Sequence, residues 1–87
     1  MTEKQKALAI QNDTLSILLC NRLNSFMDNQ HRAFKIAKTC KIIRDKTKDT
    51  VLYNACRSVI KATSKGAYDD VIKSIELTEL NYFREYN

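Results

Sequence analysis

The 87-residue chain has no proline and no tryptophan, and it has only one glycine and one histidine. Short strands and tight hairpins depend on glycine and proline at their turns. A chain so poor in these residues is therefore expected to be all-α. At this length it is expected to form a single helical domain over residues 1–87, which buries about 60–65% of the surface that the unfolded chain exposes.

Residue types that support catalysis or metal binding are also scarce. The chain has three cysteines, an odd number, and no two of them form a C-x-x-C pair. Cys20, Cys40 and Cys56 each lie among apolar helical positions, which is typical of reduced buried thiols. His31, the only histidine, falls opposite Cys40 on a helical wheel, and Gly66 stands alone instead of in a phosphate-binding loop. We therefore expect no catalytic residue, no metal site and no cofactor.

Long apolar runs are missing as well. The charged N-terminal residues are followed by an apolar stretch that Gln11, Asn12, Asp13 and Thr14 interrupt. Neither a signal peptide nor a membrane-spanning helix is expected from this pattern. Together with the unpaired cysteines, it predicts a cytoplasmic protein that does not partner with a membrane.

Positive charge exceeds negative charge. Fifteen lysines and arginines against ten acidic residues give a formal net charge of +5. This excess favours acidic partners, although it also serves solubility alone. The basic residues are spread from Lys4 to Arg84 and do not form a disordered basic tail.

The first helix is predicted over residues 3–27, with Thr2 and Gln5 as a capping box. A narrow sector of this helix is expected to face the core, and it holds Leu8, Leu15, Leu19, Leu23 and Phe26. Ile10 and Ile17 fall on nearly the opposite side. They are either scattered exposed isoleucines or a second packing seam against another subunit or a target.

A second helix is predicted over residues 30–46, after a polar turn in which Asp28 can act as a cap. Its expected buried positions are Ala33, Ile36, Ala37, Cys40 and Ile43. Lys35, Lys38 and Ile42 fall on its other side, where the lysines form either a solvated face or a contact for phosphates or an acidic protein.

The third helix is predicted over residues 50–65, behind a cap at Thr47 or Asp49, and Gly66 marks its end. A bent continuation of the second helix is the alternative, because the joint contains neither glycine nor proline. The core stripe of this third helix is expected to hold Leu52, Ala55, Cys56, Val59, Ile60, Ala62 and Thr63.

The last part of the chain is predicted to form a helix over residues 67–76 and a fifth short helix over residues 78–86. Tyr68, Val71, Ile72 and Ile75 are its expected inner residues. On one continuous helix Leu77 and Leu80 would point away from the core, so a kink near Leu77 with Thr78 as a new cap is predicted.

A small helical protein that docks on a partner protein, and inhibits or bridges it, is the function that these patterns favour. Self-association into a homo-oligomer belongs to the same hypothesis. Interfaces are enriched in aromatic residues and have apolar centres. The residues expected to make the contact are Ile10, Ile17, Leu77, Leu80, Tyr82 and Tyr86.

An alternative hypothesis is RNA or DNA binding through a basic helical face. Four-residue spacing on the third helix aligns three cations with one aromatic ring, which suits phosphate contacts and base stacking. The residues expected on this face are Lys35, Lys38, Tyr53, Arg57, Lys61 and Lys65. A minor alternative is a small anionic ligand held between helices or subunits.

Overall fold

The computed structural model describes the backbone of residues 2–86 and the side chains of residues 2–84, and this part of the chain contains four helices and no strand. The helices are α1 (Glu3–Leu23), α2 (Asn29–Lys46), α3 (Thr50–Ser64) and α4 (Tyr68–Tyr86). The predicted all-α bundle is confirmed, and so is the separation of the second and third helices.

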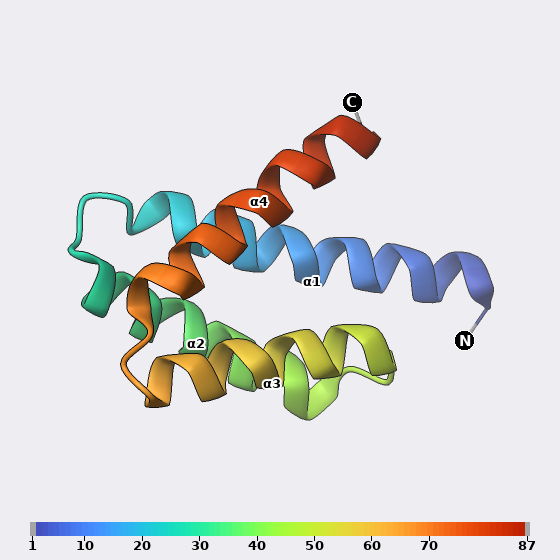
Figure 1. The fold of residues 1–87 in the computed structure, drawn as a ribbon. Helices are drawn as coiled ribbons and strands as arrows, with labels where there is room; N and C mark the ends of the chain where they lie inside the picture. Colours follow the sequence, from blue (N-terminus) through green and yellow to red (C-terminus); the bar gives the residue numbers. More distant parts are fainter. Residues whose placement is uncertain (1, 87) are drawn as a thin grey trace.

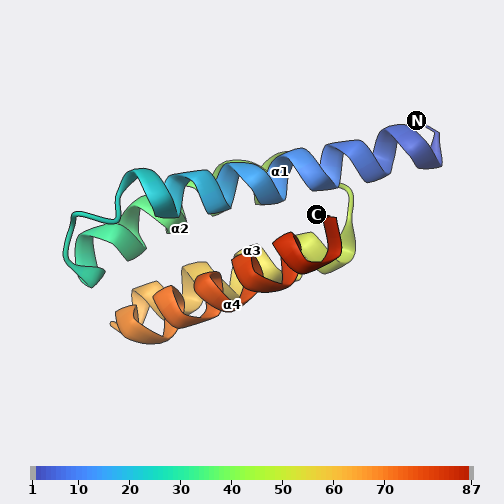
Figure 2. The same cartoon turned by 90° about the horizontal axis from the view of Figure 1, so that it is seen from above.

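The four helices form a two-by-two bundle. Seen from above, α1 and α2 lie in one layer and α3 and α4 in the other (Figure 2). The first view shows α4 crossing α1 at an angle, while α2 and α3 run together below them (Figure 1). In both views the N-terminal turns of α1 extend beyond the other helices. One side of α1 therefore packs against the bundle and the opposite side faces outward.

Side chains at the helix starts fix the first three boundaries. The Thr2 hydroxyl accepts a hydrogen bond from the Gln5 amide at 3.2 Å, and the Gln5 side chain accepts one from the Thr2 amide at 3.0 Å. Asp28 accepts from the His31 amide at 2.9 Å, and Asp49 from the Leu52 amide at 2.8 Å. Each cap satisfies an amide that the helix leaves without a partner, and each was predicted.

Gly66 ends α3 in the left-handed conformation, with φ at 80°. The Ala67 amide donates to the Ala62 carbonyl at 3.0 Å, and the Gly66 amide donates to the Thr63 carbonyl at 3.1 Å. These bonds satisfy carbonyls at the helix end, as in a Schellman motif. The reversal sends α4 back along the bundle.

The core lies between the two layers and draws on every helix. Its buried apolar members are Ile17, Leu18, Ala33, Ile36, Cys40, Ile43, Leu52, Cys56, Val71, Ile72 and Ile75. The core residues predicted on α2 are all buried, as are those predicted at Val71, Ile72 and Ile75. Around the core, Arg22 of α1 bonds Glu79 of α4 at 2.6 Å, and Asn29 at the start of α2 donates to Asp69 at 2.6 Å.

The orientation predicted for the first helix is wrong. Ile17 is 8% exposed within the core, and Ile10 packs against the core while partly buried. Asn21, on the same side, is also buried. The leucines expected inside lie outside. This helix has apolar side chains on two opposite sides, and a bundle with one core can cover only one of them.

The predicted end of the first helix and the predicted break in the last helix are also corrected. The first helix stops at Leu23, four residues early, where Asn24 caps it with bonds to Cys20. No break occurs at Leu77, because α4 is continuous from Tyr68 to Tyr86. The hydroxyl of Thr78 donates to the Ser74 carbonyl inside the helix at 2.9 Å and so does not cap a new one.

Candidate protein-interaction and anion-binding surfaces

The outer side of α1 and the turn that follows it carry a row of exposed apolar side chains, which we call the leucine face. Its members and their exposed fractions are Leu8 (50%), Leu15 (39%), Leu19 (56%), Leu23 (65%) and Phe26 (80%). The spacing of the four leucines places them on one side of α1, and Phe26 follows in the turn after the helix. Single exposed leucines are ordinary on soluble proteins, whereas several large apolar side chains exposed together form a candidate interaction surface.

Charged groups are missing from the centre of the leucine face. Between Lys6 and Arg22 the only charged residue is Asp13. Its side chain is 18% exposed and lies toward α2, where the Lys46 ammonium is 3.8 Å away. Ser16, beside the leucines, has its hydroxyl bonded to the Asn12 carbonyl at 3.0 Å. The central part of this surface is therefore apolar with uncharged polar edges.

The residues predicted to bind a partner protein are distributed differently from the leucine face. Ile10 and Ile17 pack in or against the core and are not available for docking. Leu77 and Leu80 are exposed on the outer side of α4, at 59% and 58%. Tyr82 is half-buried against the core, with its ring 5.6 Å from that of Phe83.

Tyr86, the last residue of that predicted set, has a side chain outside the described residues. The helical wheel groups the leucine face on one sector, and the prediction assigns that sector to the core. The side that is buried holds Ile10 and Ile17 together with the polar Asn21, so the sequence alone does not distinguish the two sides.

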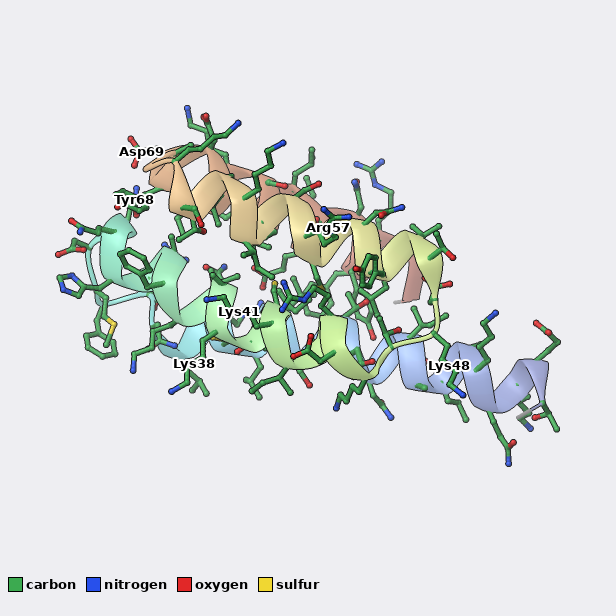
Figure 3. The ribbon with its side chains drawn as sticks, turned by 90° about the horizontal axis from the view of Figure 1, so that it is seen from below. Lys38, Lys41, Lys48, Arg57, Tyr68 and Asp69 are labelled. Atoms are coloured by element: carbon green, nitrogen blue, oxygen red, sulfur yellow. The ribbon has the colours of Figure 1, made fainter. Side chains whose placement is uncertain are left out.

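A second surface is basic and lies between α2 and α3. A pocket of about 540 Å³ there is lined by Arg44, Asn54, Arg57, Ser58, Ile60 and Lys61. Lys38 and Lys41 on α2, Arg57 on α3 and Lys48 in the connection between them lie on this side of the molecule (Figure 3). Positions 54, 57, 58 and 61 fall on one side of a helix. Two arginines, one lysine, one amide and one hydroxyl therefore converge.

Both arginines of this pocket have a neighbouring side chain that helps to orient them. The Arg44 Nε lies 3.2 Å from Asp45 Oδ1, and its side chain is 32% exposed. The Arg57 guanidinium carbon lies 5.8 Å from the centre of the Tyr53 ring, within range of a cation–π contact. No carboxylate is among the described residues that line the pocket. The arrangement suits a phosphate or another oxyanion.

The structure brings together only part of the predicted basic set. Arg57 and Lys61 line the pocket, and Tyr53 lies against Arg57. Lys35, Lys38 and Lys65 are exposed but do not line it. Arg44 was missed because it borders the apolar stripe of its own helix, and only the packing of α2 on α3 places it beside Arg57.

The buried thiols lie in an apolar pocket of about 320 Å³ among the four helices. Cys40 and Cys56 are 0% and 1% exposed, and both belong to its lining. Burial raises the pKa of both thiols, and that of Cys40 well above the usual range. Asp70 also lines the pocket, and within the described chain its lining includes no lysine or arginine. An anionic ligand is thus better accommodated between α2 and α3.

The other side chains that could take part in catalysis or bind a metal ion are dispersed. All three cysteines are free, and the His31 Nδ1 lies 2.8 Å from Asp28 Oδ1 in an exposed pair at the start of α2. Within residues 2–86 no three histidine, cysteine or acidic side chains are grouped so that they could hold a metal ion. No helix in this part of the chain combines the length and apolar character required to cross a membrane.

Comparisons of the chain with models of protein families, with curated proteins and with solved structures found no match.

Proposed function

We propose that the protein is a non-enzymatic interaction module that docks on a partner protein through the leucine face of α1. The observation that carries this proposal is the exposure of five aligned large apolar side chains with no charge at their centre. Burying them removes apolar surface from water at about 25 cal/mol per Å². The module acts by covering or bridging a surface of its partner.

The shape of the surface defines the kind of partner it fits. The leucine face is a convex ridge along a helix about 30 Å long. Such a ridge packs against another apolar helix or into an apolar groove. Lys4 and Arg22 lie toward its two ends, so the rim is basic or polar while the centre is apolar. This division between centre and rim is typical of protein interfaces.

Paired substitutions test the proposal. Leu15→Glu with Leu19→Glu places two carboxylates at the centre of the leucine face, and both positions are exposed, so the helical content is expected to be unchanged. Protein captured from the native host with the wild-type chain is expected to be lost with this variant. Circular dichroism checks that the bundle is still folded.

The matched control is Leu77→Glu with Leu80→Glu on α4, which adds the same charge at two residues of similar exposure. Capture is expected to survive in this control. The reverse pattern, in which the α4 variant loses the captured protein and the α1 variant keeps it, would reject the leucine face as the docking surface.

A second candidate function, nucleic-acid binding, is favoured by the convergence of Arg44, Arg57 and Lys61 in one pocket. Its ligand group would be a backbone phosphate, since these side chains are donors without base-reading geometry. Arg57→Glu with Lys61→Glu is expected to weaken strongly the binding of a fluorescently labelled RNA or duplex DNA at low salt. Lys4→Glu with Lys6→Glu, an equal charge change elsewhere, is expected to reduce it much less.

Salt dependence separates this function from non-specific attraction to a chain of net charge +5. The logarithm of the affinity is expected to fall linearly with the logarithm of salt concentration, with a shallower slope in the Arg57 and Lys61 variant than in wild type. Absence of any anisotropy change with the wild-type protein at low salt excludes nucleic-acid binding.

A further inference from the structure

We propose that the partner on the leucine face is a second copy of this chain, paired with the first through antiparallel α1 helices. This inference rests on the proposed function, because it names the partner of the same surface. Three observations lead to a second copy: the charge distribution around α1, the spacing of its exposed residues and the shape of the surface.

The first observation is the distribution of charge around α1. Each chain has a net charge of +5, so two copies repel each other over most of their surfaces. At the leucine face this repulsion is reduced, because the centre of the face on α1 is uncharged and Arg22 at its edge is paired with Glu79 at 2.6 Å. A strongly acidic partner would gain little from an uncharged centre. A second copy gains the apolar burial with little electrostatic cost.

Four of the five residues of the face are placed symmetrically about Ile17 in the sequence. Leu15 and Leu19 lie two residues on either side of it, and Leu8 and Phe26 lie nine residues on either side. In an antiparallel pair centred there, Leu15 of one chain meets Leu19 of the other, and Leu8 meets the Phe26 region. Leu23 lies opposite Gln11 and about one helical turn from Leu8 of the other chain, so the contact repeats across a two-fold axis, as an isologous dimer requires.

Electrostatics at the ends favour antiparallel over parallel pairing. In the antiparallel arrangement the N-terminal end of α1, with Lys4 and Lys6, lies beside the turn of the other copy that carries Asp28. The Asp28 side chain is 66% exposed. A parallel pair would instead place Lys4 and Lys6 beside their own copies and align the two helix dipoles. The antiparallel arrangement therefore places these two lysines beside the carboxylate of Asp28.

The shape and size of the contact determine how tightly the two copies are expected to bind. A convex helix ridge is matched by an equal ridge when side chains interdigitate, as in helix pairs generally. A contact made by one helix from each chain lies at the small end of interface sizes, below about 1,200 Å² in total. The dimer is therefore expected to exchange with monomer, with a dissociation constant in the micromolar range.

Light scattering and sedimentation of the full chain from about 5 to about 500 µM test the pairing. Wild type is expected to pass from monomer to dimer over this range. The variant Leu15→Glu with Leu19→Glu is expected to remain monomeric, its dissociation constant raised at least about 100-fold, while Leu77→Glu with Leu80→Glu still forms the dimer. A wild type that remains monomeric throughout, or that forms dimers insensitive to the α1 substitutions, overturns the inference.

Cross-linking tests the antiparallel register. Leu8→Cys and Leu23→Cys proteins, each with Cys20→Ser, are mixed and treated with a short bis-maleimide, while Cys40 and Cys56 stay buried. The antiparallel pair places position 8 about one helical turn from position 23 of the other copy, and two copies of position 8 about 27 Å apart. Mixed 8–23 products are expected to dominate. Dominant 8–8 and 23–23 products contradict the proposed register.

Failure of this inference is distinguishable from failure of the proposed function. A monomeric wild type that captures a host protein through Leu15 and Leu19 rejects the second copy and leaves docking through α1 intact. A monomeric wild type whose capture of host protein is unaffected by the α1 substitutions rejects both.

Discussion

At the scale of single residues, Asp28 caps the start of α2 with a carboxylate whose charge depends on pH. Its carboxylate accepts hydrogen bonds from the His31 amide and lies 2.8 Å from the His31 ring nitrogen. The backbone bond from His31, followed by the side-chain bond, lowers the pKa of Asp28 below its usual value. The charged form is thereby favoured in the folded protein.

A pH dependence follows from this lowered pKa. The stabilisation is fully present above the pKa of an unfolded aspartate, about 3.9, and is lost as the pH falls through the lower folded pKa. Asp28→Asn keeps a cap oxygen but does not titrate. Between about pH 5 and pH 2, the urea midpoint of wild type is expected to fall more steeply than that of Asp28→Asn. Parallel pH curves for the two proteins would contradict this, and Asp45→Asn, at a position that caps no helix, is the control.

Single residues also mark where sequence reasoning about the first helix failed. Ile10 and Ile17 lie opposite a more numerous set of apolar residues, four leucines and Phe26, so a helical wheel favours the leucines as the core side. The structure buries the isoleucines together with Asn21, whose side-chain oxygen has no hydrogen-bond partner. A polar residue on the buried side weakens the periodic signal. Only contacts with the other helices determine which side faces inward.

At the scale of elements, the starts of the first three helices and the end of α3 were the most predictable part of the fold. Each of these boundaries is set by a side chain or a glycine that acts on backbone atoms within a few residues, so it can be predicted from the local sequence. The residues are Thr2 with Gln5, Asp28, Asp49 and Gly66. The predicted break in α4 failed for a related reason. Exposed Leu77 and Leu80 were treated as evidence for a new helix, although solvent-exposed leucines are compatible with a continuous one.

Gly66 provides a test at this scale. Its φ of 80° is costly for residues with a Cβ, and an added Cβ would meet no other atom within 4 Å. Gly66→Ala is therefore expected to lower the free energy of unfolding by about 1 kcal/mol through backbone strain alone. Urea denaturation measures the change.

Two further variants control the Gly66 test. Gly66→Asn is expected to cost less than Gly66→Ala, since asparagine tolerates the left-handed region. Ser64→Ala, on the exposed last turn of α3, is expected to change the stability by less than about 0.5 kcal/mol. Equal stability of Gly66→Ala and wild type would show that the end of α3 does not depend on this conformation.

At the scale of the whole molecule, the sequence predicted the class of fold and most of the core, but not which surfaces remain outside. The residues of α2 and α4 that face inward follow a single apolar stripe, whereas α1 has two. The basic pocket also depends on how the helices pack. Arg44 and Arg57 are on different helices, and only the packing of α2 against α3 places both in one lining.

The two surfaces lie on different helices and have different chemistry. The leucine face belongs to α1 and the following turn, while the basic pocket is formed by α2 and α3. Pairing through α1 therefore leaves the basic pocket of each chain open to solvent. A pair of chains would present two such pockets, so a ligand with phosphates spaced to reach both would bind with higher avidity than a ligand that reaches one.

The most direct test of the leucine face as the contact between two chains is an NMR comparison of the amide spectrum of the wild-type protein at low and high concentration. Pairing through α1 predicts concentration-dependent shifts at Leu8, Leu15, Leu19, Leu23 and Phe26 and at their helical neighbours, with the amides around Arg57 and Lys61 unchanged. Spectra that are identical at all concentrations, or shifts that gather on α3 or α4 and spare α1, would contradict it.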